Sequence, residues 1–385
     1  MEVEVFSLSS VEGMLQPKIS VFIPVYRESS LLRSLLKRLI EDPYPLKEII
    51  CIIDDPTEES LKIVREMEDK VRFILNGHRL GKVNALNEAF KYSEGEILLF
   101  LDSDVQIPEN INSFLKTVVE EISDFDLLDI KKKVIRDSFI AKITHYDYLC
   151  AAITNWFFFK TLKKCLGFNG AAFAIKRKSF ERLGGFRRVV SEDLDLGIRS
   201  FLEGLRFKQS EKAEVYTKVP STLKTWYGQR KRWGIGTALW IKEYYKTLAK
   251  ITVKFPKTLI PSIFIISPSL LLFIANFFFP SISYESSAIL ILTFLTSKLG
   301  FLISSTLLLF LVVLLMRNLT LFLGSFLAAT LFYYFSARKL GYKFNPAEFL
   351  LFYLLLSPLW LLIVVTSIIK VLIQPSKKLK MDWVY

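Results

Sequence analysis

Acidic side chains follow two apolar segments of the sequence, in a pattern suited to binding a metal ion and a nucleotide. Asp102-Ser103-Asp104 comes directly after the apolar run 96–101, and Asp54-Asp55 directly after the run 48–53. Two carboxylates two residues apart can converge on one divalent cation, Mg²⁺ or Mn²⁺, and the cation can bridge them to a diphosphate. Asp54 and Asp55 can accept hydrogen bonds from a nucleoside, although paired aspartates are also common in ordinary turns.

Two further segments combine charged groups with the expected start of a helix. Lys82 follows Gly81, and a lysine beside the positive end of a helix can bind phosphate, although Lys82 is equally well read as a solvated side chain. Ser191-Glu192-Asp193 precedes another helical pattern. Acids at that position stabilise the helix dipole. The alternative role is that of a general base, which removes the proton of an acceptor hydroxyl as a new bond forms.

Gln229-Arg230-Lys231-Arg232-Trp233 is the most informative segment of the chain. On a helix, Gln229 and Trp233 share a face because they are four residues apart. An indole ring stacks on the C–H surface of a sugar, and two arginines can neutralise a diphosphate leaving group. The competing interpretation is a basic helix at a membrane surface, with Trp233 as its anchor.

These residues need a scaffold that brings them to one edge, and the first part of the chain has the pattern of one. Apolar strands alternate with amphipathic helices, the pattern of an α/β domain with a parallel sheet. In open parallel sheets, ligands bind at the carboxyl ends of the strands, where the polar residues fall here. We expect strands at 19–24, 48–53, 71–75 and 96–101 and helices at 29–40, 60–70 and 82–92.

The composition changes at Phe255, beyond which the chain is dominated by Leu, Phe, Ile and Ser. Hydrophobic residues make up 51% of the 385 residues, and the mean hydropathy is +0.35. Each of four apolar segments is long enough to cross a bilayer. We expect these candidate spans at 257–280, 286–316, 318–336 and 346–372, although three or five crossings, a re-entrant segment or the buried helices of a large soluble core are alternatives.

The predicted organisation is an α/β domain followed by an all-α transmembrane bundle. The domain occupies residues 1–238, an interfacial amphipathic helix 239–256, about four transmembrane helices 257–373, and a basic tail 374–385. Four crossings put the domain and the tail on the cytoplasmic side, as the positive-inside rule prefers. We therefore expect a multi-pass protein of the cell membrane with a cytoplasmic catalytic domain.

Charge and rare residues exclude other classes. A net charge of +13 is compatible with nucleic-acid binding, but the aromatic residues lie in apolar runs and are not interleaved with basic ones. The basic clusters 131–133 and 377–378 suit a protein that lies against an anionic leaflet. Three cysteines and two histidines provide neither a zinc site of the usual spacing nor a disulfide framework. Residues 1–20 lack the apolar core of a signal peptide.

Taken together and in this order, the four motifs resemble those of family 2 inverting glycosyltransferases. The resemblance is strongest to the processive cellulose, chitin, hyaluronan and poly-N-acetylglucosamine synthases of the Gln-x-x-Arg-Trp type. It runs from Val21 to Trp233, and membrane helices follow as in that family. It implies a GT-A type, Rossmann-like nucleotide-sugar-binding domain, a Mg²⁺ or Mn²⁺ cofactor and a nucleotide-sugar donor, with UDP favoured by family tendency.

The resemblance also implies a role for each motif residue. The donor is contacted at its base and ribose by Pro24, Tyr26 and Glu28, at uracil by Asp54 or Asp55, and at its phosphates by Lys82, Gln229, Arg230 and Arg232. Asp102 contacts the donor and, with Asp104, binds the metal. Asp193 is the catalytic base, with Glu192 beside it. Trp233 stacks on the acceptor sugar.

The implied reaction is a single displacement that inverts an α-linked donor to a β-glycoside and extends or initiates a saccharide at the membrane. Ser191 replaces the commoner threonine of the family, a change that keeps the hydroxyl. No membrane span precedes the domain in this sequence, unlike many processive synthases. Transfer of one sugar to a membrane lipid or polyprenyl phosphate is therefore an alternative. A third possibility is a transporter or nucleotide-binding regulator without transferase activity.

Overall fold

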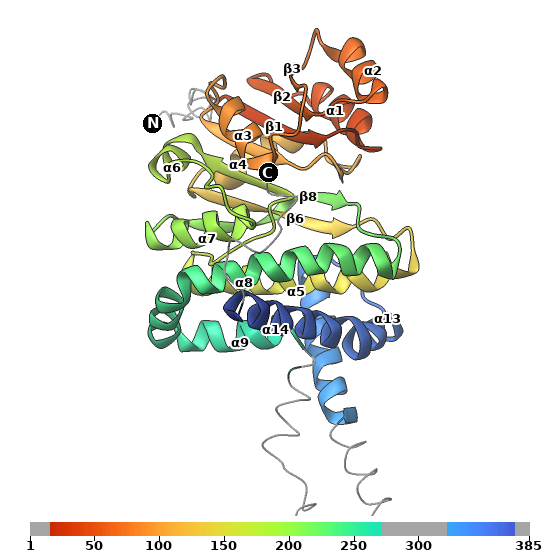
Figure 1. The fold of residues 1–385 in the computed structure, drawn as a ribbon, viewed down its shortest axis with the longest axis vertical. Helices are drawn as coiled ribbons and strands as arrows, with labels where there is room; N and C mark the ends of the chain where they lie inside the picture. Colours follow the sequence, from red (N-terminus) through yellow and green to blue (C-terminus); the bar gives the residue numbers. More distant parts are fainter. Residues whose placement is uncertain (1–15, 269, 271–321, 374–385) are drawn as a thin grey trace, which may run out of the picture. The chain divides into compact units, whose positions relative to one another are not determined.

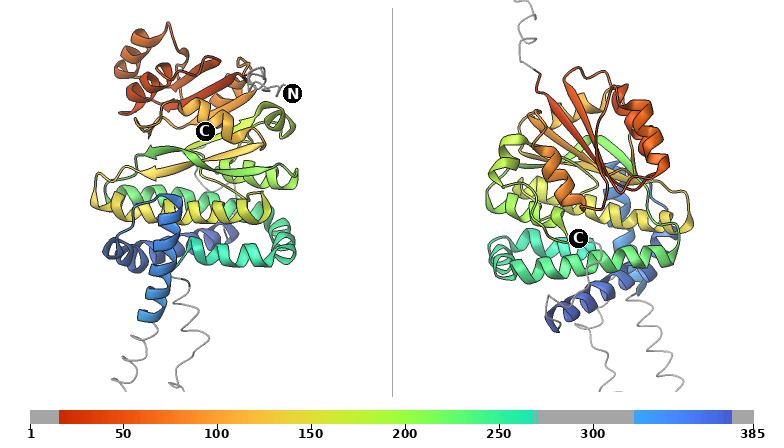
Figure 2. Two further views of the ribbon diagram at one scale, coloured as in Figure 1. Left: turned by 180° about the vertical axis from the view of Figure 1, so that it is seen from behind. Right: turned by 45° about the horizontal axis from the view of Figure 1, so that its top comes forward.

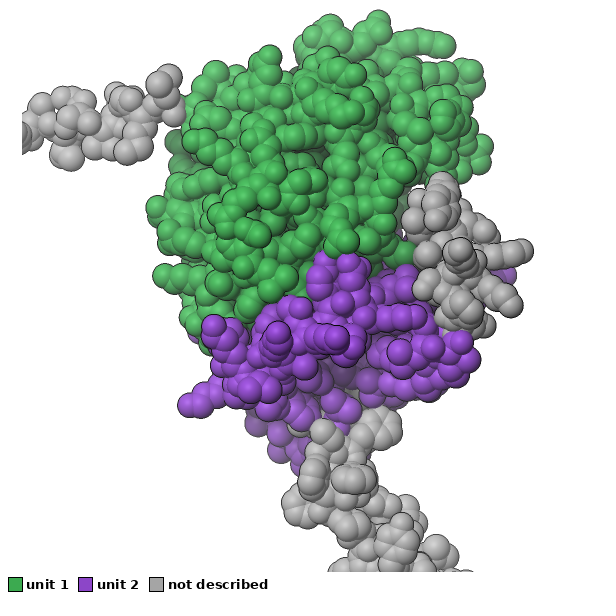
Figure 3. All heavy atoms as spheres, turned by 60° about the vertical axis from the view of Figure 1, so that its left-hand side comes forward, with its two compact units in different colours: residues 1–133, 158–218, 376–385 green, residues 134–157, 219–375 purple. Residues whose placement is uncertain are grey.

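The computed structural model describes residues 16–268, 270 and 322–373. These residues belong to two compact units, coloured separately in Figure 3. Unit 1 includes residues 16–133 and 158–218, and unit 2 includes 134–157 and the described residues from 219 onward. The site motifs before residue 218 thus belong to unit 1, whereas the segment Gln229–Trp233 belongs to unit 2.

Unit 1 is built on one mixed sheet with the strand order β3-β2-β1-β4-β7-β6-β8-β5 (Figure 1). Its strands are β1 (Ile19–Tyr26), β2 (Lys47–Asp54), β3 (Arg72–Asn76), β4 (Ile97–Leu101), β5 (Val105–Gln106), β6 (Leu127–Val134), β7 (Ala172–Lys176) and β8 (Phe207–Thr217). The helices of this unit are α1 (Leu32–Ile40), α2 (Glu58–Met67), α3 (Lys82–Phe90), α4 (Phe114–Ile122), α6 (Arg177–Arg182) and α7 (Glu192–Leu202). The four strands and three helices predicted from the sequence are all present, with ends shifted by up to three residues.

The sheet is parallel only in its first part. β1 pairs in parallel with β2 and β4, and β2 in parallel with β3. β7 then runs antiparallel to both β4 and β6. The expectation of a parallel sheet was therefore correct for the strands that carry Asp54 and Asp102 and wrong for the remainder. The alternation of strands and helices that predicted parallel pairing ends after β4, where the chain makes a long excursion before returning as β7.

Both faces of the sheet are covered by helices (Figures 1 and 2). Along β1, Val21 and Ile23 join a core with α1, α2 and α4, while Phe22 between them joins a second core with α3, α6 and α7. Successive residues of a strand point to opposite faces, so a strand covered on both sides reads as a continuous apolar run. Because β1, β2 and β4 are paired in parallel, the polar residues that follow them emerge at the same edge of the sheet.

The basic cluster 131–133 has a different role from the one that we predicted. These lysines lie on β6, where Lys131 and Lys132 are 8% and 6% exposed. Lys131 donates a hydrogen bond to the backbone oxygen of Glu211, Lys132 is paired with Asp129, and Lys133 lies 2.7 Å from Glu214. The expectation that this cluster faces an anionic leaflet was wrong, because the lysines are enclosed by the sheet and neutralised by its carboxylates.

Unit 2 is helical. Most of α5 (Phe139–Leu162) belongs to it, up to residue 157. The other helices are α8 (Leu223–Lys254), α9 (Pro256–Ile266), a helix over residues 322–340, α13 (Pro346–Leu351), η1 (Phe352–Leu356) and α14 (Ser357–Ile373). α8 is continuous, so the predicted boundary at residue 238 lies inside it, and the predicted interfacial helix 239–256 corresponds to its second half.

One stretch of the described residues, Pro346–Ile373, is long and apolar enough to cross a membrane, judged by length and composition, and contains an 18-residue window with a mean hydropathy of 2.4. It corresponds to the predicted span 346–372. The predicted span 286–316 lies outside the described residues, as do the second part of 257–280, the start of 318–336 and the basic tail 374–385. The transmembrane bundle that we predicted is therefore not confirmed.

Helix α14 packs along α8 on one side. A Cβ atom added at Gly234 of α8 would lie 2.8 Å from Oγ of Ser367, so the two backbones approach closely there. Further along, Nζ of Lys242 donates a hydrogen bond to the backbone oxygen of Val371. A second stripe of α14 is exposed and apolar, formed by Leu362, Val365, Ile369 and Leu372. α14 thus has one face covered by α8 and an apolar face that no described residue covers.

Candidate active site

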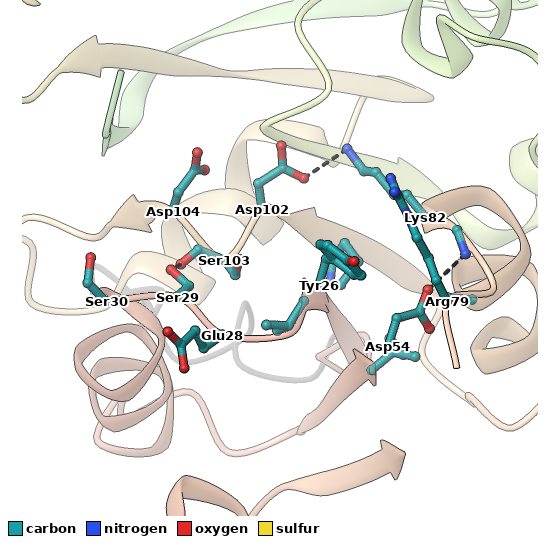
Figure 4. Close-up of a pocket in the computed structure, with 15 residues that line it drawn as sticks. Tyr26, Glu28, Ser29, Ser30, Asp54, Arg79, Lys82, Asp102, Ser103 and Asp104 are labelled. Atoms are coloured by element: carbon teal, nitrogen blue, oxygen red, sulfur yellow. Dashed lines mark hydrogen bonds and ion pairs between the residues drawn. The ribbon is translucent and has the colours of Figure 1, made fainter. Parts of the chain in front are cut away.

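The polar ends of β1, β2 and β4 open on one cavity of unit 1, with a volume of about 480 Å³ (Figure 4). Seven of the residues predicted to bind donor or metal line it, namely Pro24, Tyr26, Glu28, Asp54, Lys82, Asp102 and Asp104. Asp55 does not line it: this residue turns away in a left-handed backbone conformation with a φ of 52° and lies 3.6 Å from Arg27. The parallel strands thus bring three separate sequence motifs to the same edge of the sheet.

Asp54 organises the loop on one side of the cavity. One oxygen accepts a hydrogen bond from the side chain of Asn76, and the other accepts the backbone N–H groups of Leu80 and Gly81 at 3.0 and 2.8 Å. Gly81 has a φ of 84°, a conformation that favours glycine, and directly precedes α3. Asp54 is therefore a wall of the cavity and also the group that fixes where α3 begins.

Arg79 is a residue of the cavity that our sequence analysis missed. Its guanidinium carbon lies 4.6 Å from the ring centre of Tyr26, and both residues line the cavity. Tyr26 is 49% exposed, so its ring is accessible beside this cation. Arg79 stands in the loop that Asp54 holds, three residues before Lys82. Its place within Arg79-Leu80-Gly81-Lys82 was the available signal, since a second cation next to a flexible glycine suits an anionic ligand.

Glu28 and Ser29 fasten the first loop to its neighbours. Oε2 of Glu28 accepts a hydrogen bond from the hydroxyl of Thr57 at 2.8 Å. The hydroxyl of Ser29 donates to the backbone oxygen of Ser103 at 2.7 Å. The second contact ties the loop after β1 to the Asp102–Asp104 segment. The floor of the cavity is therefore cross-linked by hydrogen bonds from three loops.

Lys82 joins two of the predicted motifs. Its Nζ lies 2.8 Å from Oδ1 of Asp102 and 3.1 Å from Oε1 of Glu192, with 34% of the side chain exposed. Burial by itself lowers the pKa of Lys82, but the charges of Asp102, Glu192 and Asp193 together raise it well above its usual range. Lys82 is thus a permanent cation whose contacts in this structure are carboxylates.

Asp104 fits the role of a metal ligand. Its Oδ1 is buried and has no hydrogen-bond partner. Burial and the neighbouring charge of Asp102 raise the pKa of Asp104 to about 7, against the opposing effect of Lys82. A divalent cation would supply positive charge at the buried Oδ1 of Asp104, whereas Asp102 is already paired with Lys82. Among the described residues no group of three or more metal-binding side chains occurs. Two carboxylates plus substrate phosphates are, however, a usual set for Mg²⁺.

Asp193 lies in the first turn of α7 with both carboxylate oxygens held by backbone. Oδ2 accepts the N–H of Gly170 at 2.9 Å, and Oδ1 accepts the N–H of Leu194 at 2.8 Å. Burial, reinforced by the charge of Glu192, raises the pKa of Asp193 to about 6, while the two hydrogen bonds and Lys82 oppose the shift. A carboxylate with this pKa is deprotonated at neutral pH and still basic enough to accept a proton.

The segment Gln229–Trp233 lies in the first half of α8 in unit 2. Arg232 is exposed, and Gln229 and Trp233 are partly buried. Arg230 is 3% exposed and pairs with Asp147 at 2.8 Å, so it has a partner other than the diphosphate that we predicted for it. The structure therefore separates the two arginines that the motif presents together: Arg232 is accessible, whereas Arg230 belongs to the interior of its unit.

Comparisons with known proteins agree with this geometry. Residues 20–184 match the profile of the family described as Glycosyl transferase family 2. Over 257 residues the chain is 27% identical to the probable glycosyltransferase YdaM of Bacillus subtilis, covering 62% of this chain and 59% of that protein. Over 246 residues it is 26% identical to the probable glucomannan 4-beta-mannosyltransferase 11 of Oryza sativa, covering 58% of this chain and 42% of that one. The chain spans less than two thirds of either relative.

A solved structure shares the fold. The mannosyltransferase PcManGT from Pyrobaculum calidifontis, in complex with GDP-Man and Mn²⁺, aligns with 84% of this chain and 86% of its own, with a TM-score of 0.51 and 18% sequence identity. At this identity the likeness establishes the fold alone. Residues 20–184 of this chain are therefore similar to the family 2 glycosyltransferase domain, and the described chain has a GT-A-like, Rossmann-type fold built on a mixed sheet.

Proposed function

We propose that the protein is a membrane-bound inverting glycosyltransferase that moves a sugar from a nucleotide diphosphate sugar to a saccharide acceptor and forms a β-glycosidic bond. One observation carries the proposal: Lys82 brings Asp102 of the strand-end motif and Glu192, the neighbour of Asp193, to a single point. A cation site and a carboxylate base at one edge of a sheet are the two elements that sugar transfer from a diphosphate requires.

The cavity is proposed as the donor site. Tyr26 and Arg79 offer an aromatic face and a planar cation for the base, and Pro24, Glu28 and Asp54 line the same space. Lys82 and the start of α3 offer positive charge for the phosphates. PcManGT was solved with GDP-Man, whereas the resemblance of the motifs favours UDP. Both nucleotides therefore belong in the test.

Asp102 and Asp104 are proposed to hold Mg²⁺ or Mn²⁺. The bound ion would neutralise the diphosphate as it becomes the leaving group. PcManGT, the structural neighbour, was solved with Mn²⁺. Asp104 is the better placed of the two carboxylates, because its buried Oδ1 lacks a partner while Asp102 is paired with Lys82.

Asp193 is proposed as the general base. It accepts the proton of the acceptor hydroxyl while that oxygen forms a bond to C1 of the donor sugar and the bond from C1 to the diphosphate oxygen breaks. One displacement at C1 inverts its configuration, so an α-linked donor gives a β-linked product. The Gly170 and Leu194 N–H groups hold the carboxylate of Asp193 in one orientation, which keeps the base from rotating away from its substrate.

Gln229 and Arg232 are proposed to contact the diphosphate, and Trp233 to stack on the acceptor sugar, on the resemblance of their motif. We withdraw Arg230 from the donor site because of its burial and its pairing with Asp147. The exposed apolar face of α14 and the composition of Pro346–Ile373 support attachment to a membrane. The catalytic domain is proposed to face the cytoplasm.

A transfer assay tests the proposal. Membranes that contain the full chain are incubated with Mn²⁺ and each of a panel of radiolabelled UDP- and GDP-sugars, and the label is followed into the aqueous precipitate and the organic extract. Label in the precipitate is the expected result. Label in the organic extract instead would show transfer of sugar to a lipid. No transfer from any donor, with Asp193→Asn membranes giving the same background, would overturn the assignment of transferase activity.

A further inference from the structure

Arg230 lies at the centre of a cluster in unit 2 from which the proposed function uses only Trp233. Its guanidinium carbon is 4.3 Å from the ring centre of Trp233, 5.4 Å from that of Trp226 and 5.5 Å from that of Trp360. Its Nη2 donates a hydrogen bond to Oδ2 of Asp147 at 2.8 Å. Trp226 and Trp233 come from α8, Trp360 from α14 and Asp147 from α5. One cation therefore connects three helices.

The spacing along α8 explains why these groups meet. Trp226, Arg230 and Trp233 follow one another at intervals of four and three residues, so they share one face of the helix. That face also carries Gly234, where α14 approaches α8 closely. Asp147 stands on α5 between Tyr146, Leu149 and Cys150, which belong to the same apolar core as Trp226. Asp147 is thus an acid placed in an apolar surrounding, opposite one arginine.

The burial and charge of the Arg230–Asp147 pair indicate that it orients a neighbouring side chain. The side chains of Arg230 and Asp147 are 3% and 11% exposed, so both charges have lost most of their water. A buried ion pair contributes little net stability compared with apolar residues of the same volume, whereas loss of one partner is costly. The best-documented role of such pairs is to select one conformation among several. Here the selected conformation includes the orientation of an indole ring, because a guanidinium stacks on the face of a tryptophan.

We propose that Asp147 is a positioning residue: through the buried guanidinium of Arg230 it fixes the plane of the Trp233 indole. The inference rests on the proposed function in one respect only, namely that the ligand of Trp233 is a saccharide acceptor. Asp147 anchors Arg230, Arg230 stacks on Trp233, and the ring of Trp360 also lies against the cation. The side chain of Trp233 is then held ready for a sugar face without reorganisation. α14, which supplies Trp360, becomes part of the same support.

The near-ultraviolet circular dichroism of the purified full chain tests this arrangement without a substrate. The difference between the wild type and Trp233→Phe defines the band of Trp233, which is strong only if the ring is held in one asymmetric environment. In Asp147→Asn the ring loses its fixed cation, so we expect the Trp233 band to disappear. Arg136→Gln is the matched control, because it breaks another ion pair of unit 2, between Arg136 and Glu348, and should leave the band intact.

Arg230→Lys keeps the inference testable if Asp147→Asn does not fold. Lysine retains the charge opposite Asp147 but lacks the planar face, so the chain should fold and the Trp233 band should still be lost. Asp147→Glu keeps a carboxylate at this position and should therefore retain part of the Trp233 band that Asp147→Asn loses. A Trp233 band that persists in folded Asp147→Asn or folded Arg230→Lys protein would overturn the proposal. So would loss of the band in Arg136→Gln, because that result would indicate general loosening of unit 2.

Kinetics separate positioning from donor binding. In Asp147→Asn we expect the KM for a short β-linked oligosaccharide to rise about tenfold and the binding of UDP or GDP to remain unchanged, as for loss of an acceptor contact. Equal loss of nucleotide binding would contradict the assignment. If the wild type transfers no sugar at all, the proposed function fails, whereas the spectroscopic result still decides the role of Asp147.

Discussion

The ammonium group of Lys82 lies 3.1 Å from Oε1 of Glu192, although one begins α3 and the other begins α7. The same ammonium is 2.8 Å from Asp102. The carboxylates of Asp102, Glu192 and Asp193 would repel one another at the edge of the sheet without this cation. Lys82 therefore holds the site together before any substrate arrives, and an incoming diphosphate competes with the two carboxylates for it.

This relationship predicts the pH dependence of catalysis. The pKa of Asp193 is about 6, and a base must be deprotonated to act, so kcat/KM should fall as the pH is lowered through about 6. The charge of Glu192 is one of the groups that raise this pKa. In Glu192→Gln the pKa of Asp193 should therefore fall, and the acidic limb of the pH–rate profile should move to lower pH. Initial rates measured across the acidic range check this.

Glu88→Gln is a suitable control for that measurement. Glu88 also pairs with a lysine, Lys91, but both side chains are exposed and neither lines the cavity. Its removal should leave the acidic limb unchanged. A limb that moves to higher pH in Glu192→Gln would show that Glu192 does not act on the base through its negative charge.

Asp193→Asn is predicted to lose transfer and yet gain stability. The folded pKa of Asp193, about 6, lies above the ordinary value of about 4, so between these values the folded state binds the proton more tightly. The stability of the wild type therefore falls as the pH rises through this window and stays lower above it. Asparagine removes the buried charge, which for a pKa raised by about two corresponds to about 3 kcal/mol. Its amide can accept only one of the two backbone N–H groups, however, so at neutral pH and above the variant should be about 1 kcal/mol more stable.

Thermal unfolding of the two proteins at neutral and acidic pH measures this difference. It should shrink towards zero below about pH 4, where the wild-type carboxyl is protonated in both states. A variant that is less stable than the wild type at neutral pH would indicate that the hydrogen bonds from Gly170 and Leu194 outweigh the cost of the charge.

Removal of the metal should have a site-specific effect. A chelator should abolish transfer, and added Mn²⁺ or Mg²⁺ should restore it. Asp104→Asn should weaken Mn²⁺ binding in the presence of nucleotide by at least about tenfold, because it removes one of two anionic ligands. Titration calorimetry with Mn²⁺ and UDP or GDP measures the affinity. Asp126→Asn serves as the control, since that aspartate bonds Ser179 and Arg206 and does not line the cavity. Unchanged affinity in Asp104→Asn would exclude it as a ligand.

Any side chain introduced at Gly170 is predicted to lower the activity. A Cβ atom there would lie 3.1 Å from Cβ of Asp193 and 3.3 Å from its Oδ2, so the base would have to move by a few tenths of an ångström. Gly170→Ala should lower kcat by about tenfold or more while the domain remains folded, because small displacements of a catalytic group are costly. Gly324→Ala, where nothing lies within 4 Å of the added atom, should be neutral. Steady-state kinetics measure the change in kcat, and far-ultraviolet circular dichroism shows whether each variant is folded.

The sequence was sufficient to predict the elements that carry the site. Asp54 and Asp102 could be placed at neighbouring strand ends because strand periodicity and helix alternation are local properties. Lys82 could be placed at the start of α3 because Gly81 marks that start. The contact of Lys82 with Glu192 could not be predicted, since it depends on how two distant helices pack on the same sheet.

The predictions that failed concern residues whose burial depends on contacts between segments far apart in the sequence. Lys131 and Lys132 were predicted to form a surface patch because runs of charged residues are usually solvated. Both lysines are buried on β6, a strand in the interior of the sheet. Arg230 and Arg232 are two residues apart in one motif and looked equivalent. On a helix they lie on different faces, and only the partner on α5, Asp147, decides that Arg230 is buried. No periodicity in the sequence identifies that partner.

The exposed face of α14 predicts how the chain is attached to a membrane. Leu362, Val365, Ile369 and Leu372 recur at helical spacing and are exposed, whereas Ile363, Ser367 and Val371 on another face are buried. A stripe of this kind, next to a helix that carries several lysines, suits insertion into a lipid surface. Leu362→Glu combined with Ile369→Glu should therefore release a large share of the protein from liposomes in a flotation assay, because each substitution places a charge in the apolar layer. Ile363→Val changes the covered face without adding charge and should leave flotation unchanged. If the double variant floats as well as the wild type, a different part of the chain attaches the protein to the membrane.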